Sequence, residues 1–314
     1  MNDTRKGIAC IIASAAGFAL MGFFVRLCDD YGPDASAFQK SFFRNIVAFS
    51  LALLMFLRSG GHVRRPDAPC ARLETPGTWL CLLLRCIAGT AGIFANFYAL
   101  SRIPVGEAMC LNKTAPFFTI LFSFLFLGEK ISKRRASLLL LAFAGAALVA
   151  KPGMRELGSF AAFCGLFGGL CAGAAYACVR ELGVAGMSGS FIVLVFSAFS
   201  TLASLPFMLG PSYTPMTQPQ LLIMLGAGAG AAIGQFGVTA AYRFAPAGKI
   251  AVFDYLNIVF AAALGFVFLG QTPDLVSVAG FAMIVVAATP QLRRHPAEPV
   301  PPRLQSIAVD CSRK

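Results

Sequence analysis

The sequence has little charge for its length. Only 13% of the 314 residues are charged, whereas 57% are hydrophobic and the mean hydropathy is +0.74. A soluble globular protein of this size carries roughly twice that share of charged residues. The composition therefore excludes an ordinary soluble protein and indicates an all-α integral membrane protein that crosses the bilayer several times.

Histidine and acidic residues are also scarce. The two histidines, His62 and His295, both lie in polar segments, so an intramembrane catalytic triad or metal centre built on histidine is excluded. No GxxxxGK[ST] motif occurs, so an ATPase is excluded and any work must come from a gradient. We expect no cofactor and no bound metal.

Lysine and arginine outnumber aspartate and glutamate by 26 to 14, for a net charge of +12. The basic residues fall mostly in loops and tails, where membrane topology requires them. No soluble domain is left to bind nucleic acid, so we expect no nucleic-acid partner. The ten cysteines lie largely within apolar runs, and Cys164, Cys171 and Cys178 recur every seven residues as small packing residues.

Apolar segments account for most of the chain, and short Gly, Pro and Asp punctuation separates them. The first apolar run continues unbroken to Val25, which is too long for the hydrophobic region of a signal peptide, so we interpret it as a retained span. The ten segments are approximately 7–27, 36–58, 77–100, 104–127, 135–151, 160–180, 189–209, 220–243, 247–270 and 274–290. We predict two five-helix domains, 7–151 and 160–290, followed by a disordered cytoplasmic tail at 291–314.

One stretch occurs twice. Residues 104–129 and 246–271 superpose at a constant shift of 142 residues, which aligns Pro104 with Pro246 and the sequence Phe126–Gly128 with Phe268–Gly270. Each copy is about 25 residues long and largely apolar, which is enough to span a membrane. The polar exceptions fall at matching depth, Asn112 and Lys113 in the first copy and Asp254 and Tyr255 in the second.

The positive-inside rule gives the orientation. With the amino terminus inside, most lysines and arginines fall on the inner side, and only Arg26, Arg102, Lys151 and Arg155 fall outside. Both termini are therefore predicted to be cytoplasmic. Five spans per unit turn the second unit upside down, so the sequence predicts ten transmembrane helices as two inverted five-helix repeats, the architecture that permits alternating access.

Glycines at four-residue spacing recur in two spans, as Gly165, Gly169 and Gly173 and as Gly226, Gly230 and Gly234. Small residues at this spacing let helices approach closely in a membrane. We predict close helix packing at both runs, with direct contact to a ligand as the alternative.

At this point the sequence resembles the drug/metabolite transporter superfamily, in its EamA-domain branch. The resemblance rests on Phe42-Phe43-Arg44, Pro104-Val-Gly-Glu, Ala115-Pro-Phe-Phe, Phe126-Leu-Gly-Glu-Lys, Pro246-Ala-Gly-Lys and Phe268-Leu-Gly-Gln, and it extends over about residues 7–290. Gln271 stands where the family often has Glu. The resemblance implies that spans 1–4 and 6–9 surround a central cavity, with spans 5 and 10 peripheral. It also implies transport of small organic solutes. A fainter likeness to bacterial S-adenosylmethionine carriers rests on the Phe-Arg of span 2 and on Arg85–Gly89.

Five ionisable residues lie well inside predicted spans: Lys40, Arg44, Arg85, Lys113 and Asp254. A charge at mid-membrane costs about 2.5–3.5 kcal/mol on insertion scales, so these side chains should face a cavity or one another. Pro116 should kink span 4 just beyond Lys113. We predict a substrate site formed by these five residues together with Asn96, Asn112, Tyr176, Gln235, Tyr255 and Asn257.

Alternatives remain open for some of these residues. Lys40 could reach the outer headgroups, Arg85 could lie at the cytoplasmic interface, and Glu129 is expected to anchor a loop rather than to bind substrate. Asp254 could pair with Lys113, accept a proton or meet a substrate amine. The balance of four positive residues to one negative favours a carboxylate or phosphate on the substrate, and an amino-acid-like zwitterion would satisfy both signs.

The leading hypothesis is a secondary active transporter of a small polar organic metabolite in the plasma (bacterial inner) membrane, either monomer or homodimer. A carrier of S-adenosylmethionine or a nucleotide-like metabolite is the alternative within that class. From other classes, a lipid-modifying membrane enzyme would need a nucleophile and base near an interface, and a non-transporting scaffold or receptor would leave Lys113 and Asp254 without a purpose.

Overall fold

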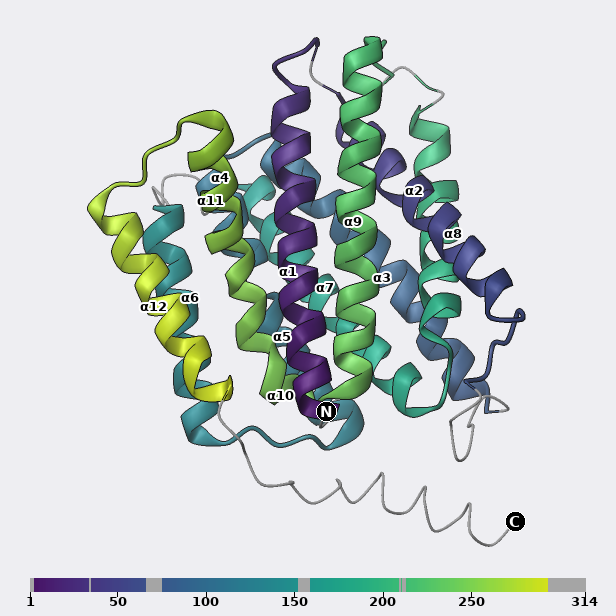
Figure 1. The fold of residues 1–314 in the computed structure, drawn as a ribbon. Coiled ribbons are helices and arrows are strands. Elements are labelled where there is room, and N and C mark those ends of the chain that lie inside the picture. Colours follow the sequence, from purple (N-terminus) through teal and green to yellow (C-terminus); the bar gives the residue numbers. More distant parts are fainter. Residues whose placement is uncertain are drawn as a thin grey trace, which may run out of the picture.

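The protein is a bundle of long helices, seen here in a computed structural model that describes residues 3–33, 35–65, 75–151, 159–208, 210 and 213–292 (Figure 1). No strand longer than an isolated bridge occurs in these ranges. The helices are α1 (Asp3–Cys28), α2 (Ala37–Arg58), α3 (Pro76–Leu100), α4 (Val105–Asn112), α5 (Ala115–Leu127), α6 (Lys133–Ala150), α7 (Phe160–Val184), α8 (Gly189–Met208), α9 (Gln218–Phe244), α10 (Ala247–Ile250), the 3₁₀ turn η2 (Ala251–Tyr255), α11 (Leu256–Leu269) and α12 (Leu275–Leu292).

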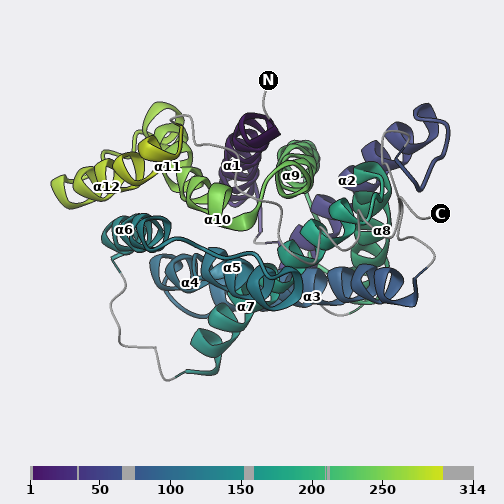
Figure 2. The same cartoon turned by 90° about the horizontal axis from the view of Figure 1, so that it is seen from below.

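These helices make up the ten predicted spans. Nine of them are long and apolar enough to cross a membrane within the described ranges, counting α4 with α5 and α10 with α11 as one span each. The tenth is α6, which has 18 residues but begins with three charged residues, Lys133, Arg134 and Arg135. It packs along α12 at one edge of the bundle, so spans 5 and 10 are peripheral (Figures 1 and 2).

The two copies of the repeated stretch are the two interrupted spans. In the first copy, α4 ends at Asn112 and α5 starts at Ala115. Pro116 has no N–H to donate to the carbonyl of Asn112, so a continuous helix would lose that hydrogen bond, and the break lies where the sequence predicts a kink. In the second copy, a 3₁₀ turn from Ala251 to Tyr255 interrupts the span without a proline.

Two contacts across the bundle reveal the inversion. The backbone N–H of Ala247, where span 9 starts, donates to Glu129 Oε2, just past the end of span 4, over 3.3 Å. At the other end, Lys151 after span 5 pairs with Asp274 before span 10. Equivalent spans therefore run in opposite directions. In addition, α1 begins and α12 ends at the same end of the bundle (Figure 1).

Both glycine runs pack helix on helix. A Cβ at Gly230 would lie 2.7 Å from the backbone N of Met21, so α1 and α9 touch through their backbones. A Cβ at Gly169 would lie 2.5 Å from Thr114 Oγ1 and 3.0 Å from the carbonyl of Leu111. The predicted packing role is confirmed, and the α7 run packs directly on the broken span 4.

Helix ends differ from the prediction by a few residues. Helix α1 starts at Asp3 rather than near 7, and α7 continues past 180 to Val184. Helix α12 includes Gln291 and Leu292, which the sequence assigns to a disordered tail. Gln291 is buried, so this end is packed. The predicted tail from 293 onward lies outside the described residues, as does 66–74 of the basic loop.

Candidate functional site

The two helix breaks meet in an ion pair. Lys113 Nζ lies 3.0 Å from Asp254 Oδ2 and also donates to the Asp254 carbonyl oxygen over 3.3 Å. The side chains are only 12% and 15% exposed. Of the three alternatives for Asp254, the structure contains the pairing with Lys113.

Local structure explains why charges are tolerated here. Lys113 is the C-cap of α4, where the helix dipole favours a cation, and Asp254 lies two residues before the start of α11, where the dipole favours an anion. The break also leaves the carbonyl of Lys113 outside the helical ladder, because the N–H of Phe117 bonds to Thr114. The hydroxyl of Tyr255 donates to that carbonyl over 2.7 Å.

Polar groups of the interrupted spans thus form hydrogen bonds with the other repeat. Tyr255 of span 9 hydrogen-bonds span 4, and Asn257 Nδ2 donates to the carbonyl of Ala15 in α1 over 3.2 Å. These bonds satisfy polar groups that would be costly to leave unpaired away from water. These polar side chains therefore connect the two repeats at the middle of otherwise apolar spans, and we call this place the polar joint.

Two arginines lie near this joint without an acidic partner among the described residues. Arg85 in α3 is 2% exposed, and its Cζ lies 3.8 Å from the ring centroid of Phe196 in α8. Its Nε has no hydrogen-bond partner among the residues that the structure describes. Arg44 in α2 lies with its Cζ 5.6 Å from the ring centroid of Phe18 in α1. Arg85 is therefore a buried side chain that packs between α3 and α8.

Tyr176 of α7 lies near both arginines and the ion pair, close enough for the charges of Arg44, Arg85 and Asp254 to act on it. Its ring stacks on Tyr242 of α9, with centroids 5.5 Å apart and an interplanar angle of 20°. The structure therefore brings five predicted residues into one cluster, which we call the central cluster: Arg44, Arg85, Lys113, Tyr176 and Asp254.

Other predicted residues have separate surroundings. Lys40 is near the outer end of α2, where its Nζ lies 3.3 Å from Asp29 Oδ1, so the structure does not bring it to the central cluster. Asn96 packs on α7, since a Cβ at Gly168 would lie 3.3 Å from its backbone N. Gln235 of α9 is buried, and its Nε2 has no hydrogen-bond partner in the described part of the chain. Asn112 is half-buried as the last residue of α4.

A buried hydrogen-bond network joins several helices at the end of the bundle where α1 begins. Arg180 Nε donates to Glu129 Oε1 over 2.8 Å, and its Nη1 donates to the carbonyls of Tyr242 and Arg243, each over 3.1 Å. Together with the bond from Ala247 to Glu129, this ties α5, α7, α9 and α10 together. Glu129 does anchor its loop, as expected, and it also joins both repeats.

Sequence reasoning missed two buried ionisable residues. Glu107 in α4 and Lys249 in α10 are both buried and occupy equivalent places in the repeated stretch. When Pro-Val-Gly-Glu of the first copy is aligned with Pro-Ala-Gly-Lys of the second, Glu107 and Lys249 occupy the same position. That alignment could have indicated both residues from the sequence.

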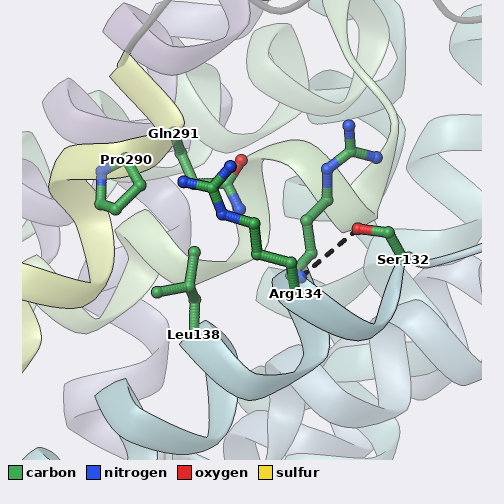
Figure 3. Close-up of a pocket in the computed structure, with 6 residues that line it drawn as sticks. Ser132, Arg134, Leu138, Pro290 and Gln291 are labelled. Carbon is green, nitrogen blue, oxygen red and sulfur yellow. Dashed lines mark hydrogen bonds between the residues drawn. The ribbon is translucent and has the colours of Figure 1, made fainter.

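A separate cavity of about 170 Å³ lies at the charged start of α6 and the end of α12 (Figure 3). Ser132 caps α6 there by accepting from the N–H of Arg135. This cavity belongs to the peripheral helix pair and not to the central cluster. It is lined by Ser132, Arg134, Arg135, Leu138, Pro290 and Gln291.

Comparison with known families and proteins gives consistent matches along the chain. The EamA-like transporter family matches residues 5–151 and again 159–289. A pseudopaline exporter of Pseudomonas aeruginosa is 31% identical over 283 residues, which is 90% of this chain and 94% of the exporter. A riboflavin transporter of Brucella anthropi is 26% identical, over 81% of this chain and 87% of its own.

A solved crystal structure has the same fold. It superposes with a TM-score of 0.70 at 16% sequence identity, over 89% of this chain and 97% of the other. At that identity the likeness concerns the fold alone.

Proposed function

Because the chain belongs to the EamA-like transporter family, we propose that it is a secondary carrier that moves a small polar organic metabolite by alternating access. The similar proteins are named as transporters, so the chain is a membrane transporter and not an enzyme. The proposed cargo bears a carboxylate or phosphate group.

The names of the relatives do not give the cargo. Pseudopaline and riboflavin are different compounds, although both relatives align with most of this chain. The cargo class is therefore argued from the charges of the central cluster, in which Arg44 and Arg85 attract an anionic group.

The observation that carries the proposal is the ion pair between Lys113 and Asp254. It joins the interrupted spans of two inverted repeats, and discontinuous helices at mid-membrane are where transporters of this architecture bind cargo and rearrange. A charged cargo bound at Arg44 and Arg85 changes the electrostatic environment of the nearby pair, so binding can change how tightly the two repeats are held. The buried network of Glu129 and Arg180, at the end of the bundle where α1 begins, fits one of the two end states of alternating access.

The proposed placement is the bacterial inner membrane with both termini cytoplasmic. Lysine and arginine gather at the end of the bundle where α1 begins and α5 ends. Cytoplasmic loops carry this excess. No ATP-binding loop motif occurs in the sequence, so the energy comes from a gradient of the cargo or of an ion.

Uptake into proteoliposomes tests the proposal. The purified chain is reconstituted, and a panel of radiolabelled amino acids, dicarboxylates and phosphate esters is offered with and without a proton gradient. Liposomes without protein and liposomes with Lys113→Met serve as controls. Saturable accumulation of at least one compound in the wild type alone supports the carrier, whereas equal uptake in all three preparations contradicts it.

A further inference from the structure

We infer that Arg85, with Arg44 beside it, is the anion-binding site of the cargo path, and that the cargo carries net negative charge rather than being a zwitterion. The inference rests on the proposed carrier function and specifies the cargo of the same central cluster.

Arg85 is a buried charge that no acidic side chain neutralises within the described part of the chain. It is 2% exposed, and its Nε has no hydrogen-bond partner among the described residues. Its guanidinium carbon lies over the Phe196 ring, 3.8 Å from the ring centroid. A ring face stabilises a cation, but less than a counterion does, and a buried charge without a counterion destabilises a protein. A guanidinium held this way is set to receive an anion.

The backbone of α3 makes room for this guanidinium. A Cβ at Gly89, one turn beyond Arg85, would lie 2.2 Å from Arg85 Nη1 and 2.6 Å from Cε2 of Phe196. Any larger residue at 89 would displace both groups. The guanidinium presents its donors in a planar fork that matches a carboxylate or phosphate in two hydrogen bonds.

Arg44 adds a second positive charge. It repels Arg85 electrostatically and, like Arg85, has no acidic partner among the described residues. Tyr176 interacts with both arginines, and its hydroxyl can donate to an anion placed between them. Two like charges held near one another are most stable with an anion between them.

The charges of the central cluster also exclude the zwitterion that the sequence favours. That reading assigns Asp254 to a substrate amine, but Asp254 is already paired with Lys113 over 3.0 Å. The pair is neutral as a whole, and the two arginines leave an excess of two positive charges. A cargo with net negative charge neutralises that excess without breaking the pair.

Thermal unfolding of the purified full-length chain tests this without any transport assay. At constant ionic strength and scan rate, succinate, inorganic phosphate or glycine is added. Succinate or phosphate should raise the midpoint by about 2 °C or more, because a ligand that binds only the folded state stabilises it. Glycine, a zwitterion, should leave the midpoint unchanged.

Variants then assign the effect to the site. Arg85→Gln should abolish the anion-dependent rise, and its midpoint without anion should equal or exceed that of the wild type, since an unpaired buried charge is removed. Arg85→Lys keeps the charge and loses the fork, so it should retain less than half of the rise. Arg26→Gln, at an exposed arginine paired with Asp30, is the matched control and should retain all of it.

Three results would overturn the inference: no rise with either anion in the wild type, an equal rise with glycine, or a full rise in Arg85→Gln. If Arg85→Gln cannot be purified, a full rise in Arg85→Lys overturns it as well. If the midpoint rise depends on Arg85 but no transport occurs in proteoliposomes, the carrier proposal is wrong and the anion site remains. If transport occurs but the midpoint rise does not depend on Arg85, only the present inference is wrong.

Discussion

The ion pair between Lys113 and Asp254 is the residue-level feature on which the account depends. Two opposite charges at this depth are tolerated because each one neutralises the other and lies at the favourable end of a short helix. Removing one partner of a buried pair destabilises a protein by roughly 3–5 kcal/mol, because the remaining charge has no counterion.

We therefore predict strong coupling in a double-mutant cycle. Asp254→Asn and Lys113→Met should each abolish or strongly reduce transport, and the double variant should be less damaging than the sum. The coupling in the free energy of unfolding should be about 0.5–3 kcal/mol. Transport rates and unfolding midpoints of the four proteins measure it. Effects that add without coupling would mean that the two residues act independently.

Lys151 and Asp274 provide the matched control pair. They are paired where span 5 ends and span 10 begins, but both side chains are about half exposed. Hydrogen bonds from Lys151 and then Ser277 lower the pKa of Asp274 to about 2, so this stabilisation is present above the usual aspartate range and is lost only as the pH falls through about 2. The same cycle at this pair should give much weaker coupling than at Lys113 and Asp254, because water screens exposed charges, and it should leave transport intact.

Sequence reasoning found the ion pair but not all of its surroundings. The internal repeat predicts that Lys113 and Asp254 lie at equal depth, and the structure pairs them. Depth along a span can be predicted from position in the sequence, whereas the partner of a side chain depends on helix rotation and tilt. For this reason the pairing of Lys40 with Asp29 and the contact of Arg85 with Phe196 were not predictable.

The interrupted spans are the elements that make the site. Pro116 explains the first break and could be recognised in the sequence. The second break is a 3₁₀ turn that contains no proline, and its residues form part of an unremarkable apolar run around Asp254. Tertiary contacts, among them the bond from Tyr255 to Lys113, hold that turn, which is why sequence alone did not predict it.

Helix α7 supports the first break through a single glycine. A methyl group at Gly169 would lie 2.5 Å from Thr114 Oγ1 and 3.0 Å from a backbone carbonyl, so Gly169→Ala must push the broken segment away. We expect this variant to lower the unfolding midpoint by at least about 2 °C and to reduce transport severalfold.

The matched control for Gly169 is Gly22→Ala in α1. Gly22 is also helical, but nothing lies within 4 Å of a Cβ built there. Alanine has the higher helix propensity, so this variant should be neutral or slightly stabilising. Equal loss of stability in both variants would contradict the packing argument for α7.

In the whole molecule, inversion of the repeats places a buried ion pair at the end where α1 begins and a half-exposed ion pair at the opposite end. Glu129 and Arg180 are buried where span 4 ends and span 9 begins, whereas Lys151 and Asp274 are half exposed where span 5 ends and span 10 begins. The bundle was largely predictable from hydropathy, the repeat and the positive-inside rule. The buried network of Glu129 and Arg180 at one end was not predictable, because it depends on contacts between helices that are distant in the sequence.

Topology follows directly from this arrangement. A reporter that is active only in the cytoplasm should work when fused at either terminus or within 59–76, and should be silent within the loop that follows Lys151. Fusions at all four places, with expression measured by immunoblot, provide the test. A silent but well-expressed carboxyl-terminal fusion would contradict the inverted repeat.

Alternating access around the central cluster is the central claim, and side-specific labelling tests it most directly. The measurement uses Asn112→Cys, at the break in span 4, in a chain whose ten native cysteines are replaced. A membrane-impermeant maleimide is applied to right-side-out and to inside-out vesicles. We predict labelling from both sides, with Glu129→Gln shifting it toward the inner side because that change weakens the bond to Arg180. Labelling from one side only, unchanged by Glu129→Gln, would contradict alternating access.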